Sequence, residues 1–277
     1  MKQANQSILP GRMVSDLLLV SDMDGTLLTR DKRISDRNME AVRRFTSYGG
    51  RFTIATGRSV VSAERYVKLL ELRQPAILFN GAAVYDYGKK GIIWHTDLIP
   101  EAIDYVRDIM RDFPTVGVEV LTEEQIHIPR WNRYVTRHVC TENLTYRLST
   151  VDEISSGWLK VLFALDHDLI PSLASYVREK NYAGVDFVES DQNYFEMLPQ
   201  GNSKGTALLQ LADILQVPHD HLIAVGDYYN DLEMIRRAYL GAAVSNAPNE
   251  VKDAADLVLG SHEEDAFADL IDLILGE

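Results

Sequence analysis

Two aspartates directly after a buried strand constrain this chain more than any other feature of its sequence. Residues 17–20 are four apolar residues in a row, and Asp22 and Asp24 follow them, just before Gly25. An apolar run bounded by polar residues is typical of a strand that is buried on both faces. Side chains two residues apart in an extended chain point the same way, so Asp22 and Asp24 can face one site. Carboxylates this close repel each other unless a cation or a proton lies between them.

The aspartate pair taken alone leaves more than one interpretation open. An acidic turn after a strand is the ordinary one. A calcium-binding loop is another, but it needs further oxygen ligands within the next few residues. Apart from Thr26, the chain supplies Leu27 and Leu28 there. The motif therefore argues against a calcium loop, and it leaves the acidic turn and a functional carboxylate pair as alternatives.

Strands and helices alternate around this motif and again near the end of the chain. Further strand candidates are short apolar runs, at 51–56, 76–79, 221–225, 242–244 and 257–259. Apolar residues spaced three and four apart predict helices, at 35–49, 59–72, 204–215 and 266–275. This order predicts an α/β fold, a Rossmann-like parallel sheet with helices on both faces. In such sheets ligands bind at the carboxyl ends of the strands.

The pattern changes between residues 87 and 194. Strand candidates in this stretch alternate apolar with polar residues, and helical segments lie between them. Alternation predicts a mostly antiparallel sheet with one covered face. We interpret 87–194 as an α+β domain inserted into the first domain, with one continuous mixed sheet as the alternative. The remaining segments are then a loosely held tail, 1–15, and a discontinuous core, 16–86 and 195–277.

The chain is acidic and has a single cysteine. Its 28 lysines and arginines and 41 acidic residues give a formal net charge of −13. That charge argues against binding to nucleic acid or to anionic membranes, and an anionic substrate would need a metal ion or a local basic site. Cys140 excludes an internal disulfide and favours a cytoplasmic location. No uninterrupted apolar stretch approaches the ~18 residues of a membrane span, and no signal-peptide core precedes residue 16.

Polar residues with catalytic chemistry stand at four of the predicted strand ends and helix starts. Besides Asp22 and Asp24 they are Thr56 with Gly57, Lys204, and Asp227 with Asn230 and Asp231. Taken singly, each residue has an ordinary interpretation. Thr56, Asp227 and Asp231 could cap helices, and Lys204 could be a solvated surface lysine. Together and in this order, they are similar to the four motifs of the haloacid dehalogenase superfamily of phosphohydrolases.

The sequence resembles one branch of that superfamily in particular, the Cof-type phosphatases. The resemblance is carried by four segments, ATGRS at 55–59, NGA at 80–82, SKG at 203–205 and NAPNEVK at 246–252. Those phosphatases have a large C2-type cap between the second and third motifs, where we expect the inserted domain. The similarity covers the core segments 16–86 and 195–277, and in the cap it extends only to size and position.

The resemblance implies phosphate transfer through an aspartyl-phosphate intermediate. It implies Asp22 as the nucleophile and Asp24 as the acid that protonates the leaving oxygen and then activates water. The implied cofactor is Mg²⁺, bound by the side chains of Asp22 and Asp227 and the backbone carbonyl of Asp24. Phosphate contacts are implied for the remaining motif residues, Met23, Thr56, Gly57, Lys204 and Asn230. Asp231 is expected behind them, where it orients the ligands or Lys204.

We therefore expect a Mg²⁺-dependent phosphatase that acts on small phosphorylated metabolites. Sugar phosphates, flavin- or nucleotide-like phosphates and pyridoxal phosphate all suit the family. A phosphomutase of the same superfamily is an alternative, and a non-catalytic module that binds a phosphorylated metabolite is an alternative of another class. The sequence names neither the substrate nor the oligomeric state.

Specificity is expected to come from the inserted domain, because the core motifs address only the phosphate. Its densest group of hydrogen-bond donors and aromatic surface is the segment 127–133, with Arg130, Trp131 and Arg133. If this segment faces the core, its residues contact the leaving group, and Arg58 and Asn80 contact it from the core. A solvated loop with Trp131 packed on its own sheet is the alternative.

Overall fold

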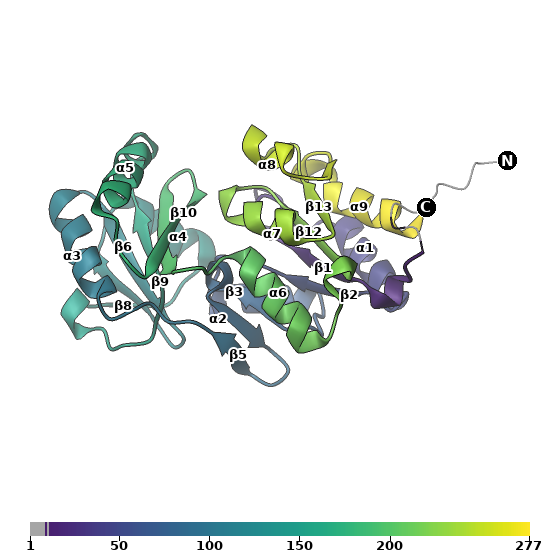
Figure 1. Ribbon diagram of the computed structural model, residues 1–277, viewed down its shortest axis with the longest axis horizontal. Coiled ribbons are helices and arrows are strands. Elements are labelled where there is room, and N and C mark those ends of the chain that lie inside the picture. The colour runs from purple at the N-terminus through teal and green to yellow at the C-terminus, as the bar shows by residue number, and fades with distance from the viewer. Residues whose placement is uncertain (1–8, 10) are drawn as a thin grey trace.

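The computed structural model describes residue 9 and residues 11–277. Two groups of strands lie side by side in it, a parallel sheet and an antiparallel sheet, each with its own helices (Figure 1). No helix among these residues is long and apolar enough to cross a membrane.

Strand β1 (Leu18–Ser21) is an inner strand of the parallel sheet. It lies between β12 (Leu222–Gly226) and β2 (Arg51–Ile54), and the strand order is β14-β13-β12-β1-β2. The outer strands are β13 (Leu240–Ala243) and β14 (Leu257–Val258). Ser21 is level with Val225 on one side and Ile54 on the other. The residues that follow these three strands, Asp22, Asp227 and Thr56 among them, therefore leave the sheet at the same edge.

Helices cover both faces of this sheet because successive side chains of β1 point to opposite sides. Leu19 packs in one apolar cluster with Phe45 of α1 (Asp36–Ser47) and Phe267 of α9 (Ala266–Leu275). Leu18 and Val20 pack in another with Leu208 of α6 (Lys204–Leu215). Three further helices complete the layers. They are α2 (Val60–Leu69) and the shorter α7 (Leu232–Arg237) and α8 (Asn249–Asp253).

A small antiparallel sheet extends the core beyond β2. Its order is β3-β4-β5, with β3 (Ala76–Leu78), β4 (Ala83–Asp86) and β5 (Gly91–His95). A parallel bridge between Ala55 and Ile77 joins β3 to the end of β2.

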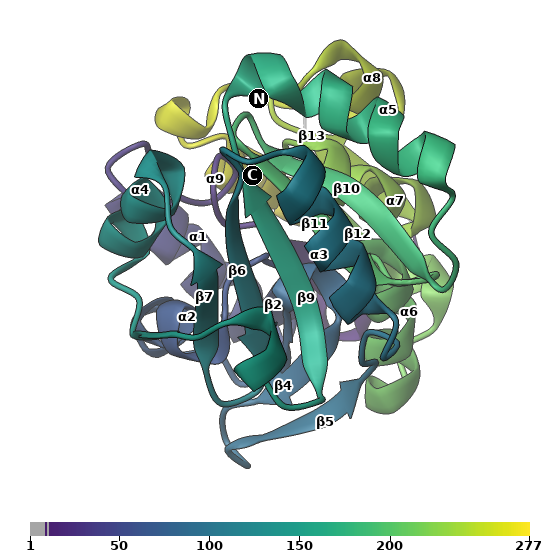
Figure 2. The ribbon, with the colours of Figure 1, turned by 90° about the vertical axis from the view of Figure 1, so that its left-hand side faces the viewer.

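The second large sheet has six strands in the order β10-β11-β9-β6-β7-β8 (Figure 2). All its pairs are antiparallel except β7 with β8. In chain order its strands are β6 (Gly117–Thr122), β7 (Ile126–Arg130), β8 (Tyr146–Leu148), β9 (Trp158–Ala164), β10 (Val185–Asp191) and β11 (Tyr194–Pro199). Two helices pack on one face, α3 (Ala102–Asp112) and α5 (Ile170–Lys180), and their apolar residues cluster with Val161 and Phe163 of β9. Helix α4 (Arg133–Glu142) follows β7 and packs in the cluster of the core.

The expected α/β fold, with a parallel sheet and a separate antiparallel region, is confirmed. The limits 87 and 194 of the inserted domain stay a prediction. Strand pairing places residues 91–95 in the sheet of β3 and β4, and residues 194–199 in the six-stranded sheet. Strands β4, β7, β8 and β11 were not expected from the sequence, since each is short or mixes apolar with charged residues.

The segment before β1 differs from the loosely held tail that we expected. Leu9 is buried. The Nε of Arg12 donates a hydrogen bond to the carbonyl oxygen of Asp220, and its guanidinium lies 3.8 Å from the centre of the Tyr239 ring. A cation stacked on an aromatic face adds to the hydrogen bond, and together they dock this segment on the core. The rest of the expected tail, residues 1–8 and 10, lies outside the described residues.

Candidate active site

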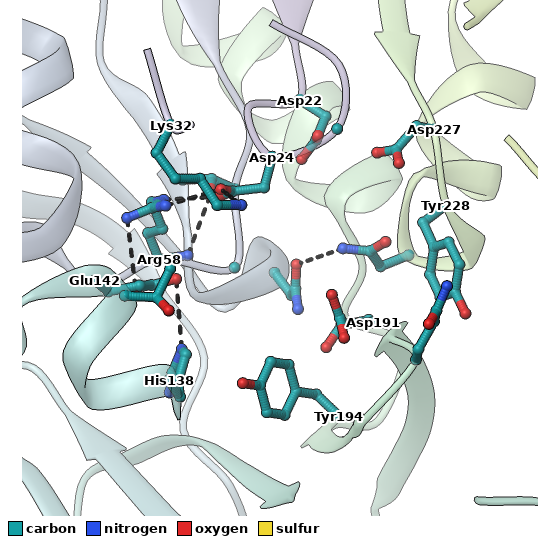
Figure 3. A pocket seen from close by; sticks show the side chains of 18 of the residues that line it. Asp22, Asp24, Lys32, Arg58, His138, Glu142, Asp191, Tyr194, Asp227 and Tyr228 are labelled. Carbon is teal, nitrogen blue, oxygen red and sulfur yellow. Dashed lines mark hydrogen bonds and ion pairs between the residues drawn. The ribbon is translucent and has the colours of Figure 1, made fainter. Parts of the chain in front are cut away.

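A cavity of about 700 Å³ opens where the strands of the parallel sheet end (Figure 3). Most of the expected core residues line it, namely Asp22, Asp24, Thr56, Gly57, Arg58, Asn80, Asp227 and Asn230. The opposite wall comes from helix α4 and from strands β9, β10 and β11 of the antiparallel sheet. A volume of this size suits a small metabolite.

Asp22 lies at the centre of this edge and is bound by a buried lysine. It is 5 % exposed, and its Oδ1 accepts a hydrogen bond of 2.6 Å from the Nζ of Lys204. Its Oδ2 is buried and has no hydrogen-bond partner among the described residues. Burial, together with the charge of Asp231, raises the pKa of Asp22 to about 7, although Lys204 acts in the opposite direction. One oxygen of Asp22 is therefore fixed by the protein while the other is left for a ligand.

Lys204 reaches Asp22 because a helix begins beside it. Ser203 caps α6, its Oγ accepting a hydrogen bond from the backbone N–H of Thr206, and Lys204 is the first helical residue. The Nζ of Lys204 also donates to Oδ1 of Asp231 at 2.6 Å, and the lysine is fully buried. Burial alone would lower the pKa of Lys204, but the charges of Asp22 and Asp231 outweigh it and raise that pKa. The lysine thus stays charged between two carboxylates.

Asp231 organises the loop after β12. Its Oδ2 accepts hydrogen bonds from the backbone N–H groups of Asp227 at 2.9 Å and Tyr228 at 3.2 Å. Both of its oxygens are therefore engaged within the protein. Asp231 is not among the residues that line the cavity, and its proposed role in orienting Lys204 stays a prediction.

Asp227 lies beside Asp22 at the same edge of the cavity (Figure 3). The hydroxyl of Thr26 donates to Oδ1 of Asp227 at 3.2 Å. Burial, and then the charges of Asp22 and Asp231, raise the pKa of Asp227 well above its usual range. Oxygens of Asp22, Asp227 and Asp231 lie within 4.8 Å of one another. Since Asp231 is already engaged, Asp22 Oδ2 and Asp227 are the oxygens that fit a metal ion, which would relieve their repulsion.

Gly25 makes room for Asp227. Its φ is +88°, and a Cβ added there would lie 2.4 Å from Oδ2 of Asp227. We expect Gly25→Ala to lower kcat by at least roughly 100-fold, because the carboxylate must move and a small displacement at a reacting site has this effect. Steady-state kinetics and thermal unfolding of the purified variant test this.

Two control variants separate the contact at Gly25 from its backbone strain. Gly157 has a φ of +92° with nothing within 4 Å of an added Cβ, and Gly91 has neither a positive φ nor a near contact. Gly157→Ala should lower stability by about 1–2 kcal/mol and keep its activity, and Gly91→Ala should change neither. Full activity of Gly25→Ala would contradict this account of the loop.

Asp24 is held by two cations. Arg58 donates to both of its oxygens, Nε to Oδ2 at 2.7 Å and Nη2 to Oδ1 at 2.8 Å, and Lys32 donates to Oδ1 at 2.7 Å (Figure 3). Burial alone would raise the pKa of Asp24, but Arg58 and Lys32 outweigh it and hold that pKa well below its usual range. Asp24 is therefore a carboxylate in this arrangement, ready to accept a proton rather than to donate one.

Arg58 thus lies at the cavity, as expected, but its guanidinium is already engaged by protein. Besides Asp24, it lies near Glu142 at the end of α4, with Nη1 3.6 Å from Oε2. That nitrogen makes no hydrogen bond with the described residues. Glu142 also pairs with His138. Burial alone would lower the pKa of His138, but the charges of Glu119 and Glu142 outweigh burial and raise that pKa to about 10. These charges connect the antiparallel region to the core.

Of the remaining core residues, Thr56 contacts Arg58, and Gly57 and Asn230 contact Asn80. Thr56 is buried, and its Oγ1 accepts a hydrogen bond from the backbone N–H of Arg58. A Cβ on Gly57 would come within 3.0 Å of the Asn80 amide. Asn230 donates from Nδ2 to Oδ1 of Asn80 at 3.0 Å. Met23 is buried in the core cluster, so its backbone N–H is the group that remains for the expected phosphate contact.

The expected cluster in the segment 127–133 does not reach the cavity. Arg130 donates to the carbonyl of Met110 at 2.7 Å, and Arg133 pairs with Asp166. Trp131 is 41 % exposed and lies against Tyr146. Helix α4 explains this outcome, because it begins at Arg133 and the cavity is lined by residues closer to its other end. The lining residues of α4 are Arg137, His138, Thr141 and Glu142.

Several cavity residues of the antiparallel region were not identified from the sequence. They include Lys160 and Leu162 of β9, Ser190 and Asp191 of β10, and Tyr194 and Glu196 of β11. One signal was available: Lys160 and Glu196 are single charges within otherwise apolar segments, 158–164 and 194–199. A charge inside a buried strand requires a partner, and these two residues are partners.

Comparison with known proteins identifies the family. A family model described as haloacid dehalogenase-like hydrolase matches residues 19–271. A 5-amino-6-(5-phospho-D-ribitylamino)uracil phosphatase of Bacillus subtilis is 28 % identical over 91 % of this chain and 94 % of its own length. A pyridoxal phosphate phosphatase of Escherichia coli is 26 % identical over 92 % of this chain and 97 % of its own. A haloacid dehalogenase-like hydrolase of Bacteroides thetaiotaomicron, of known structure, is 26 % identical with a TM-score of 0.82, over 93 % of this chain and 99 % of its own.

These matches extend through the core and the antiparallel region alike, whereas the resemblance noted in the sequence covered only the core motifs. They confirm the expected superfamily and the expected enzyme class, a phosphoric monoester hydrolase. The chain belongs to the haloacid dehalogenase-like hydrolase family.

Proposed function

We propose that this protein is a Mg²⁺-dependent phosphatase of small phosphorylated metabolites that forms an aspartyl-phosphate on Asp22. The observation that carries the proposal is the free, buried Oδ2 of Asp22 at the carboxyl end of the sheet, in a carboxylate that Lys204 holds through Oδ1 and that has an oxygen within 4.8 Å of Asp227. A carboxylate whose orientation is fixed through one oxygen presents the other for attack. The named activities of the relatives, on pyridoxal phosphate and on a ribitylamino-uracil phosphate, support a small-molecule substrate.

The reaction has two halves. In the first, an oxygen of Asp22 forms a bond to phosphorus while the bond from phosphorus to the leaving oxygen breaks, and the leaving oxygen takes a proton from Asp24. In the second, Asp24 accepts a proton from water, whose oxygen attacks phosphorus and releases Asp22 with inorganic phosphate. The ionised state that Arg58 and Lys32 impose on Asp24 suits the second half. The first half requires that Asp24 carry a proton when the substrate is bound.

The other core residues stabilise charge. Lys204 offsets the charge of Asp22 and of the transferring phosphate, and Thr56, Asn230 and the backbone N–H groups of Met23 and Gly57 donate hydrogen bonds to phosphate oxygens. The side chains of Asp22 and Asp227 and the backbone carbonyl of Asp24 would bind Mg²⁺, which supplies charge compensation for the phosphate dianion among these carboxylates.

Hydrolysis of p-nitrophenyl phosphate tests the proposed function. Activity should be lost in EDTA and return with Mg²⁺, whereas Ca²⁺ should inhibit. Calcium accepts more oxygen ligands at longer distances, so a carboxylate that binds it through both oxygens is held away from in-line attack. Release of free phosphate, measured for a panel of phosphorylated metabolites, separates a phosphatase from a phosphomutase. Full activity in chelator would contradict the metal dependence, and absence of turnover with Mg²⁺ would contradict the phosphatase.

A further inference from the structure

Two charged side chains of the antiparallel sheet face the cavity from buried positions. Val161 and Phe163 of β9 pack under α3 and α5, so the alternate residues Lys160 and Leu162 point the other way and line the cavity. The same alternation in β11 directs Glu196 to the cavity. Lys160 and Glu196 are each 2 % exposed, so neither is a solvated surface charge.

The two side chains form an ion pair whose hydrogen-bonding capacity is only partly used. The Nζ of Lys160 donates to Oε2 of Glu196 at 2.8 Å, and Glu196 is its only hydrogen-bond partner among the described residues. An ammonium group has three donors, so two remain. Glu196 accepts two further hydrogen bonds, from Asn80 at 2.7 Å and from Ser190 at 2.6 Å. A carboxylate has room for about four, so one acceptor position remains.

We infer that Lys160 and Glu196 select the leaving group by binding neighbouring hydroxyls, and that they disfavour a leaving group with a second negative charge. This inference rests on the proposed phosphatase function. A hydroxyl donates one hydrogen bond and accepts others, so a pair of hydroxyls can accept from Lys160 and donate to Glu196. The three donors that hold Glu196 come from three segments of the chain, which keeps the pair rigid.

The charges on this side of the cavity determine which leaving group is preferred. The Lys160–Glu196 pair is neutral as a unit, and Asp191 and Glu142 line the same side of the cavity. A second anionic group beside the pair would compete with Glu196 for Lys160 and would lie next to these carboxylates. Two cations also line this side, and both are already engaged by protein: Arg137 donates to Asn193, and His138 pairs with Glu119 and Glu142. An uncharged polyol keeps the ion pair intact and loses nothing to repulsion.

Binding of two matched ligands tests the inference without relying on turnover. Glucitol 6-phosphate and 6-phosphogluconate have the same chain length and differ in a CH₂OH group against a carboxylate. Dissociation constants are measured by calorimetry with Mg²⁺ in the Asp22→Asn background, in which no phosphate can be released. We expect tighter binding of glucitol 6-phosphate by about 10-fold, the usual effect of a charge-assisted hydrogen bond.

Single substitutions in the pair should shift this preference in opposite directions. Glu196→Gln leaves the charge of Lys160 unpaired and should reduce the preference for the polyol by about 10-fold or reverse it. Lys160→Met leaves Glu196 charged and should increase that preference. Glu179→Gln, the same change at an exposed position of α5, should leave both dissociation constants unchanged. Thermal unfolding of each variant verifies that it is folded.

The outcomes distinguish this inference from the proposed function. Equal changes for both ligands in both variants would mean that the pair is structural, and no preference in the parent protein would equally overturn the inference. Neither result would contradict the proposed phosphatase function, because p-nitrophenyl phosphate turnover by the wild-type protein is measured separately.

Discussion

Asp22→Asn should abolish turnover, with a loss of at least roughly 10⁴-fold in kcat, and leave the fold intact. An amide is not a competent nucleophile, yet it keeps the shape of the side chain and can still accept a hydrogen bond from Lys204. Burial and the charge of Asp231 raise the pKa of Asp22 to about 7, and in the variant Lys204 keeps Asp231 as a charged partner. We therefore expect the melting temperature of the variant to stay near that of the wild type.

The control for this variant removes a nearby acid that has no part in the proposed mechanism. Asp31 is exposed and pairs weakly with Arg33, so Asp31→Asn should keep full activity. Mass spectrometry adds a second measurement, since wild-type protein quenched in acid during turnover should carry a phosphoryl group and Asp22→Asn should carry none. Near wild-type activity of Asp22→Asn would contradict the covalent mechanism.

The core of the site follows from the sequence for a geometrical reason. Asp22, Thr56 and Asp227 each come after an apolar run, and in a parallel sheet the carboxyl ends of neighbouring strands meet at one edge. Lys204 could be placed because a capping serine precedes it and a helix must begin there. Local patterns therefore predict these positions, although the order β14-β13-β12-β1-β2 depends on packing between distant segments.

The opposite wall of the cavity does not follow from local patterns. Lys160 and Glu196 are 36 residues apart, and only the pairing of β9 with β11 brings them together. The donor-rich segment with Arg130 and Arg133 was a candidate for contact with the substrate, but it lies at the end of α4 that does not line the cavity. Composition does not indicate which end of a helix faces a site. The contacts of Arg58 were also not foreseen: a residue expected to bind substrate holds Asp24 instead.

Lys204 combines a structural and a catalytic task, so its removal should have the second large effect. Its ammonium lies 2.6 Å from both Asp22 and Asp231, and all three groups are buried. Breaking a buried ion pair leaves an uncompensated charge, at a cost of about 3–5 kcal/mol. Asp231 also holds two backbone N–H groups of the loop that carries Asp227, so the loop depends on Lys204 as well.

We expect Lys204→Met to lower the free energy of unfolding by about 3 kcal/mol and kcat by at least roughly 100-fold. Methionine fills similar volume without charge, so the loss reports the missing ammonium rather than a cavity. Denaturant unfolding and steady-state kinetics measure the two effects. Lys204→Arg should recover part of the stability but little of the activity, since a planar guanidinium cannot replace a compact ammonium between two fixed carboxylates.

A control lysine distinguishes these effects from a general loss of positive charge. Lys89 is exposed, and within the described part of the chain its ammonium pairs only with Asp86, three residues earlier, so Lys89→Met should change neither stability nor activity measurably. If Lys204→Arg matched the wild type in kcat, the precise position of the ammonium would be unimportant for the reaction. If Lys204→Met kept full stability, the carboxylates of Asp22 and Asp231 would have to be neutral in the folded protein, and the proposed role of Lys204 in offsetting charge would be wrong.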